Sequence, residues 1–134
     1  MCLFCDIVAG KIPTYNVYED EDILAFLDIS QATKGHTLVI PKKHYSSLLD
    51  CPKQEAIKLM AVVSDLSKTL VHNLDAKGIN VLSNAGEMAG QTVPHFHIHL
   101  LPRYSQEDGF KTTFLETNNP NYSSLLEQIK NGNH

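Results

Sequence analysis

The chain has 134 residues, enough for one domain with a sizeable hydrophobic core. Its hydrophobic content of 43% and charged content of 19% are typical of an ordinary globular protein. A formal net charge of -4, with no basic block, argues against a nucleic-acid polymer as partner but leaves a single nucleotide open. Without a bilayer-spanning apolar run or a basic signal-peptide start, we expect a cytoplasmic protein with no membrane partner.

A Cys-x-x-Cys pair, Cys2 and Cys5, opens the chain, ahead of one or two expected helical turns that end at Gly10. Such a pair indicates a metal site, a redox site or an inert terminus. A redox site of this kind requires a strand before the first thiol. Only Met1 precedes Cys2, which disfavours the redox interpretation. A metal site needs two further ligands, which histidines can supply. The spacing favours a metal and leaves the other two interpretations open.

Three strands are expected next, the first two joined by an acidic turn, at residues 16–19, 23–28 and 36–41. Asp28 ends the second strand, where a carboxylate could accept two hydroxyl groups, as from a ribose. Taken alone, the residue is more simply a turn or capping residue. In the same way, an isolated His36 or His44 is more often a surface residue than a ligand.

Residues 52–74 have the repeat of one long amphipathic helix, with Pro52 at its start. Its main apolar stripe comprises Ala56, Leu59, Met60, Val63, Leu66 and Leu70. Because Ile57 and Val62 lie off that stripe, the helix has more apolar surface than one sheet face should cover. We interpret the excess as a homodimer interface, with a broad core face as the rival interpretation.

Three histidines alternate with apolar residues after a fourth expected strand at 78–84 and a glycine-containing loop at 85–91. They are His95, His97 and His99, followed by Phe96, Ile98 and Leu100 in the alternate positions. Period-two alternation indicates a strand with one buried face, so all three imidazoles should lie on the opposite face. Three histidines on one face have no packing rationale. The face therefore predicts a site for zinc or for imidazole chemistry on phosphate.

After Arg103 the periodicity stops, and only residues 122–130 predict a further short amphipathic helix. We find no repeat, linker or second domain. The chain is therefore expected to be one domain, 1–134, with a core at about 2–104 and a C-terminal tail at 105–134. Neighbouring strands around one long helix predict an α+β fold, with an antiparallel sheet of about five strands and short terminal helices.

Taken together, these motifs resemble the histidine-triad (HIT) superfamily, in its Hint-like branch of bacterial type. Residues 95–101 fit the signature His-φ-His-φ-His-φ-φ, where φ is apolar, and 24–30, 35–44 and 90–92 match further motifs of that branch. The resemblance covers nearly the whole chain and implies a HIT-like fold. It also implies a hydrolase or nucleotidyl transferase acting on purine nucleoside 5'-phosphoramidates or related compounds, through a covalent nucleotidyl-histidine.

The resemblance also assigns roles to individual residues. His97 would be the nucleophile, His99 would assist the leaving group, and His36 and His95 would complete the catalytic set. Asp28 would hold the ribose hydroxyls of a purine nucleoside monophosphate. The residues facing the phosphate would be Asn84, Gln91 and Thr92. The residues around the base would be Leu3, Phe4, Ile7, Ile12, Phe26 and Ile29.

A structural zinc is implied as well, because some superfamily members bind one through two cysteines and two histidines. The matching set is Cys2, Cys5, His44 and His95, a closed Cys₂His₂ site. No step of the phosphate chemistry needs this metal. The resemblance further implies a homodimer whose partner shapes the leaving-group side of the pocket. The chain lacks the C-terminal tryptophan of several Hint proteins, which leaves the leaving group open.

Three alternatives compete with a nucleotide phosphoramidase. The first is a dinucleoside polyphosphate hydrolase, which belongs to the same chemical class. The second is a nucleotide-binding regulatory module whose hydrolysis is incidental, although such a module would need neither His97 nor His99. The third is a zinc hydrolase with His95, His97 and His99 as ligands, which gives the cysteine pair no role.

Overall fold

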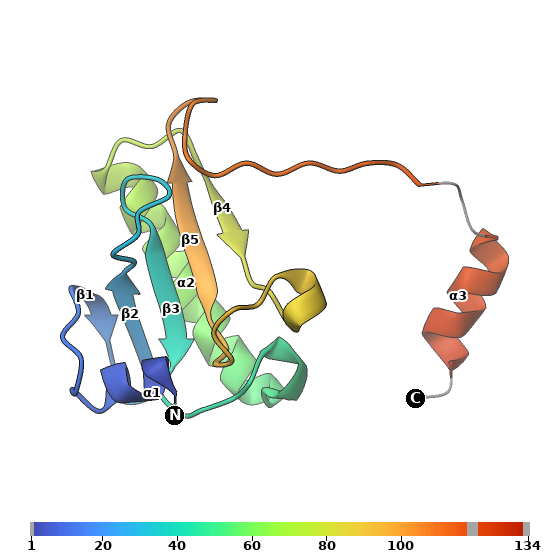
Figure 1. The fold of residues 1–134 in the computed structure, drawn as a ribbon, viewed down its shortest axis with the longest axis horizontal. Helices are drawn as coiled ribbons and strands as arrows, with labels where there is room; N and C mark the ends of the chain where they lie inside the picture. The colour runs from blue at the N-terminus through green and yellow to red at the C-terminus, as the bar shows by residue number, and fades with distance from the viewer. Residues whose placement is uncertain (1, 118–120, 133–134) are drawn as a thin grey trace.

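The computed structural model describes residues 2–117 and 121–132. Its centre is a five-stranded sheet in which every neighbouring pair is antiparallel, in the order β1-β2-β3-β5-β4 (Figure 1). The strands are β1 (Asn16–Glu19), β2 (Ile23–Leu27), β3 (Thr37–Pro41), β4 (Gly78–Leu82) and β5 (Ile98–Arg103). The α-helices are α1 (Leu3–Val8), α2 (Lys53–Asn73) and α3 (Tyr122–Asn131), with short 3₁₀ helices at Leu48–Asp50 and Glu87–Ala89. The predicted α+β class and antiparallel five-stranded sheet are confirmed.

The two faces of the sheet are covered by different helices. The long helix α2 crosses behind the sheet in Figure 1, and α1 covers the opposite face at one end. The α2 face is lined by Ile23, Ala25, Val39, Phe96, Ile98 and Leu100. The α1 face is lined by Leu24, Phe26, Leu38 and Ile40, which pack with Phe4 and Ile7. Because side chains alternate along a strand, the residues between Phe96, Ile98 and Leu100 fall on the α1 face.

The buried side of α2 differs in three positions from the predicted stripe, since Ala56 and Met60 are not buried and Val62 is. Its buried residues are Leu59, Val62, Val63, Leu66 and Leu70. Val62 belongs to the core, because it lies three residues after Leu59 and four before Leu66 and shares their face. Met60 follows Leu59 directly, about 100° further round the helix, and is 51% exposed, as is Ile57. The excess apolar surface predicted for this helix therefore exists, but it consists of Met60 and Ile57.

The histidine segment enters the sheet later than its alternation predicted. β5 begins at Ile98, and β4 ends at Leu82 instead of Asn84. Ahead of Ile98, the Phe96 N–H donates to the carbonyl of Tyr45 (2.7 Å), so this stretch bonds to a loop and not to a neighbouring strand. The predicted alternation of faces still holds, since Phe96 packs on the α2 side.

The C-terminal tail leaves the domain after a turn at residues 104–109. The predicted short helix is present as α3, which has no buried residue and stands well apart from the sheet in Figure 1. Residues 118–120 and 133–134 of the predicted tail, and Met1, lie outside the described residues. Within the described ranges, none of the helices has the length and apolar character needed to cross a bilayer.

Candidate functional site

Four metal-ligand side chains meet where α1 packs against the sheet. Cys2 Sγ lies 3.3 Å from His95 Nδ1, and Cys5 Sγ lies 3.3 Å from His44 Nδ1. The two Nδ1 atoms are 3.2 Å apart, and all four donor atoms lie within 4.8 Å of one another. A tetrahedral zinc with bonds of about 2.0–2.3 Å spaces its ligand atoms roughly 3.3–3.8 Å apart. The residues chosen from sequence therefore form a Cys₂His₂ cluster of the size that zinc requires.

Local structure orients the ligands of this cluster. Cys2 caps α1, its Sγ accepting the N–H of Cys5 (3.2 Å), so both thiols lie at the first turn of the helix. His95 Nε2 is 2.9 Å from the carbonyl of Pro41, and donating a proton there leaves Nδ1 unprotonated toward the cysteines. Burial raises the pKa of the Cys5 thiol to about 11, so a bound metal must displace its proton.

The ring of His97 is fixed by the backbone of His95. Its Nδ1 lies 2.6 Å from the carbonyl of His95 and donates a proton to it, so Nε2 carries the free lone pair. The hydroxyl of Ser83 donates to the carbonyl of His97 (2.7 Å) and anchors the same stretch of chain. The Phe4 ring packs edge-on against the imidazole, with the centroids 5.1 Å apart. His97 is thus a buried imidazole with one unprotonated nitrogen available for chemistry.

His36 and His99 form a second hydrogen-bonded pair beside His97. The Ala32 N–H donates to His36 Nδ1 (3.2 Å), so the proton of neutral His36 is on Nε2. That Nε2–H donates to His99 Nδ1 (2.9 Å), which leaves the His99 proton on Nε2. The rings of His99 and His97 have centroids 5.0 Å apart. An imidazole acceptor and an imidazole donor therefore stand side by side.

Burial keeps these imidazoles neutral. It lowers the pKa of His97, opposed by the hydrogen bond to the His95 carbonyl, and it lowers the pKa of His36, opposed by the charge of Asp28. It also lowers the pKa of His99 to about 4, and the charges that His97 and His36 can carry act in the same direction. At neutral pH the three imidazoles are consequently uncharged, so His97 keeps a lone pair on Nε2 and His99 keeps a single N–H.

The low pKa of His99 predicts a loss of stability in mild acid. The unfolded chain, with a histidine pKa of about 6.5, binds protons between this value and about 4, where folded His99 does not. The free energy of unfolding should therefore rise with pH across that range, with His99 contributing roughly 3 kcal/mol over it. Denaturant titrations of wild type and His99→Asn between about pH 4 and about pH 8 check this. Equal slopes in the two proteins would contradict it.

Asp28 faces this histidine pair from the end of β2. Its Oδ1 accepts the N–H of Ser30 (2.8 Å), which is the turn-capping role considered from the sequence. Its Oδ2 lies 3.6 Å from His36 Nε2. Oδ2 accepts no backbone N–H from the described part of the chain, so it can accept hydroxyl groups from a ligand.

A cavity of about 270 Å³ lies next to Asp28, between α1 and the sheet. It is lined by all six residues predicted to surround a base and by Asp28 itself. The remaining lining residues, which the sequence did not indicate, are Pro13, Thr14, Leu27, Leu38 and Val93. Phe4 lines the cavity and also touches His97, so the cavity and the histidines are neighbours. The volume lies slightly below the range of small-molecule pockets, which starts at about 300 Å³.

The loop predicted to face a phosphate is held together by one of its own members. The Gln91 amide donates to the carbonyls of Ser46 (2.6 Å) and Val93 (3.0 Å) and accepts the N–H of Gly86 (2.8 Å). Gln91 therefore holds the loop together through both the NH₂ group and the oxygen of its side-chain amide. Asn84 is half-buried and Thr92 is exposed. The phosphate-facing role of Asn84, Gln91 and Thr92 stays a prediction.

Several known proteins are similar to this chain. The pattern of the HIT domain matches residues 9–106. Protein hit of Bacillus subtilis (strain 168) is 49% identical over 109 residues, which are 81% of this chain and 75% of that protein. The crystal structure of a member of the HIT family from Bacillus subtilis has a TM-score of 0.91 and 41% identity, covering 96% and 94% of the two chains. A hypothetical histidine triad nucleotide-binding protein from Sulfolobus tokodaii has a TM-score of 0.76 and 36% identity, covering 96% and 88%.

Proposed function

This chain belongs to the HIT domain family, and from that membership and the pairing of His97 with His99 we propose that it is a nucleotidyl hydrolase. Its substrates are purine nucleoside 5'-phosphoramidates and related nucleotidyl compounds. The reaction passes through a covalent nucleotidyl-histidine on His97. The observation that carries the proposal is the opposite protonation of two adjacent imidazoles: His97 offers a lone pair where His99 offers a proton.

The two half-reactions use this opposite protonation in turn. His97 Nε2 attacks the α-phosphorus, and the bond to the leaving amine or oxygen breaks. His99, protonated on both ring nitrogens once the anionic substrate is bound, gives its Nε2 proton to the departing group and becomes neutral. The negative charge of the bound phosphate raises the pKa of the His99 imidazole and so favours its proton-donating form during this step. In the second half-reaction His99 takes a proton from water, which attacks phosphorus and releases His97. A phospho-imidazole is easily made and easily hydrolysed, which suits this role.

Binding is supported by the groups around the histidines. The free Oδ2 of Asp28 would accept the ribose hydroxyls, and the apolar cavity lined by Phe4 and Phe26 would hold the base. Backbone amides of the loop that ends at Thr92 would stabilise charge on the phosphate oxygens. The Sulfolobus tokodaii relative is named as a nucleotide-binding protein, which supports the same ligand class.

We assign the Cys₂His₂ cluster to a structural zinc that takes no part in the reaction. Four protein ligands leave a tetrahedral ion no position for substrate. The ion would fasten α1 to His95, whose carbonyl orients the nucleophile. His95 therefore supports catalysis through its backbone and binds metal through its ring. This division also weighs against a zinc hydrolase, because the ring nitrogens of His95 and His97 are directed to separate partners.

A comparison of two substrates tests the function. We expect the protein to release AMP from an adenosine 5'-phosphoramidate with a kcat/KM at least about tenfold above that for a diadenosine polyphosphate. The reverse order would identify a dinucleoside polyphosphate hydrolase. Tight AMP binding with no turnover of either compound would instead identify a regulatory binding module and contradict the proposal.

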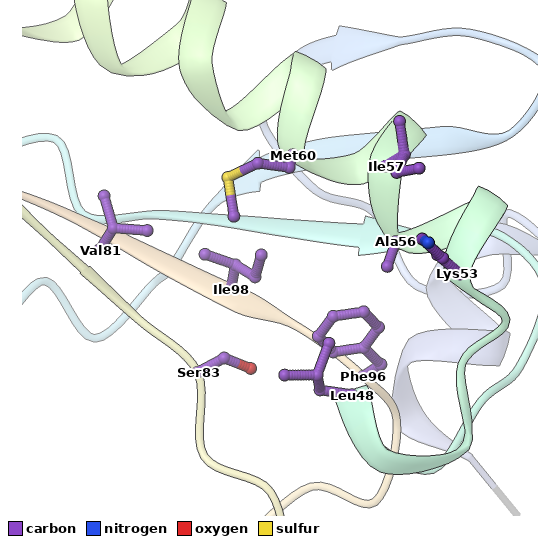
Figure 2. A pocket seen from close by; sticks show the side chains of 9 residues that line it. All are labelled: Leu48, Lys53, Ala56, Ile57, Met60, Val81, Ser83, Phe96 and Ile98. Atoms are coloured by element: carbon purple, nitrogen blue, oxygen red, sulfur yellow. The ribbon is translucent and has the colours of Figure 1, made fainter.

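We further propose that the protein is a homodimer joined along α2 and β4. A groove of about 410 Å³ separates these elements, and it exposes Ile57, Met60 and Val81 (Figure 2). Each such side chain contributes up to about 1.5–3 kcal/mol when a partner covers it. β4 is also an edge strand, so two copies can continue one sheet across a two-fold axis. The uncovered apolar side chains Leu125, Leu126 and Ile129 of α3 offer a second contact.

Light scattering at micromolar concentration should therefore give about twice the chain mass of 14.9 kDa. Met60→Glu should shift the protein toward monomer, because it would bury a charge in the groove. Thr69→Glu is the matched control, since it adds the same charge at an exposed position on the other side of the helix, near Val17 and Leu27. A wild-type monomer with full activity would contradict both the interface and any role of the partner in the pocket.

A further inference from the structure

The turn at residues 104–109, directly after β5, is tightly held although it lies outside the histidine site. Its organiser is the carboxylate of Asp108, whose Oδ2 accepts from Arg103 Nε (3.0 Å) and from the N–H groups of Tyr104 (2.8 Å) and Ser105 (3.2 Å). Arg103 also donates from Nη1 to Asn80 Oδ1 on β4 (2.7 Å). The turn is thus fixed to the end of the sheet.

This turn holds the loop at residues 31–35, which precedes His36. The hydroxyl of Tyr104 donates to the carbonyl of Lys34 (2.7 Å), and the N–H of Gly109 donates to the carbonyl of Ala32 (3.1 Å). The contact at Gly109 is so close that an added Cβ would lie 2.5 Å from the Ala32 carbonyl oxygen. Real Cβ atoms do not approach a backbone oxygen to that distance. Residue 109 must therefore be glycine for the loop to keep its position.

The loop held in this way determines the proton position on His36. Ala32 makes both of the hydrogen bonds that matter here: its carbonyl accepts the N–H of Gly109, and its own N–H donates to His36 Nδ1. Inside the loop, Gln31 Oε1 accepts the N–H of Gly35 (2.7 Å), and Gln31 Nε2 donates to the carbonyl of His36 (2.8 Å). Displacing Ala32 would remove the N–H that requires His36 to be protonated on Nε2.

We propose that Tyr104 and Gly109 are positioning residues that fix the tautomers of His36 and His99. Without the Ala32 donor, His36 can move its proton to Nδ1 and present a bare Nε2 to His99. His99 must then protonate Nδ1 to keep their hydrogen bond, and it loses the Nε2–H beside His97. The catalytic consequence rests on the proposed function, whereas the tautomers themselves do not.

Gly109→Ala tests the proposal. We expect kcat on an adenosine 5'-phosphoramidate to fall roughly tenfold to a hundredfold, the range that a displacement of about 1 Å costs, with KM nearly unchanged. Heteronuclear NMR of the ring nitrogens should show a loss of the Nε2–H form of His36 and His99. His72→Ala is the control, because it alters an exposed residue of α2 outside this turn and the loop that the turn holds. It should leave both kcat and the tautomers as in wild type.

Tyr104→Phe provides a second, milder variant in case Gly109→Ala does not fold. It removes only the hydroxyl bonded to Lys34, so we expect a drop in kcat of about threefold to tenfold with the same change in the NMR spectra. A lowered kcat with wild-type tautomers, or no change in either variant, would overturn the proposal. If wild type hydrolyses no nucleotidyl substrate, the proposed function fails, and the spectra still decide whether the turn fixes the tautomers.

Discussion

His97→Ala is expected to lower kcat by at least about a thousandfold while AMP binds with nearly wild-type affinity. The imidazole supplies the attacking nitrogen, and loss of a nucleophile costs several powers of ten because positioning alone cannot replace it. The base cavity and Asp28 remain in place, so nucleotide binding should survive. Steady-state kinetics and calorimetric titration with AMP measure the two quantities.

The matched control is His72→Ala, which removes an exposed histidine near the end of α2. It should leave both kcat and AMP affinity unchanged. A His97→Ala protein that retains more than about a tenth of the wild-type kcat would rule out covalent catalysis by this residue. A variant that loses AMP binding as well would show that His97 acts mainly in ligand binding.

Protein purified without chelator is expected to contain one zinc ion per chain, bound by Cys2, Cys5, His44 and His95. Cys5→Ser should lose the ion and unfold roughly 10 °C lower, as expected for a stability loss of about 3 kcal/mol. Cys51→Ser is the control, because that half-buried thiol lies outside the cluster. Metal analysis and thermal unfolding of the three proteins measure these effects.

Catalysis should persist after chelation wherever the fold survives, since the cluster has no ligand position free for substrate. A wild-type protein without zinc would end the structural assignment. Activity that disappears when zinc is removed from a still-folded protein, and returns with the metal, would instead support a zinc hydrolase.

The periodicity of apolar residues located the elements of the fold and the faces of the sheet. A strand that buries one face has apolar residues at every second position, so this face can be recognised in the sequence. The periodicity correctly placed Phe96, Ile98 and Leu100 together on one buried face, which the structure shows to be the α2 side. It did not show where the strand begins, since the hydrogen bonds before Ile98 go to a loop that no local pattern reveals. On α2 the pattern predicted Met60 in the buried stripe and Val62 outside it, whereas Val62 is buried and Met60 is exposed. A helix with a broad apolar surface can pack on a sheet in several rotations, and the sequence alone does not determine which one is adopted.

The candidate site was predicted best where side-chain type carries the chemistry. The four ligands of the Cys₂His₂ cluster come together from three distant parts of the chain, as the resemblance implied. Backbone groups with no sequence signature orient the histidines: the carbonyl of His95 for His97, and the N–H of Ala32 for His36. The internal role of the Gln91 amide escaped prediction for the same reason, since its three partners are all main-chain groups.

Direct trapping of the covalent intermediate tests the central proposal. Wild-type protein mixed rapidly with an adenosine 5'-phosphoramidate and quenched in denaturant at alkaline pH, where phospho-imidazoles survive, should gain the mass of one adenylyl group. Peptide mapping should locate that group on His97, and the His97→Ala protein should gain none. Turnover by wild type with no adduct at times shorter than one catalytic cycle, or an adduct on another residue, would contradict it.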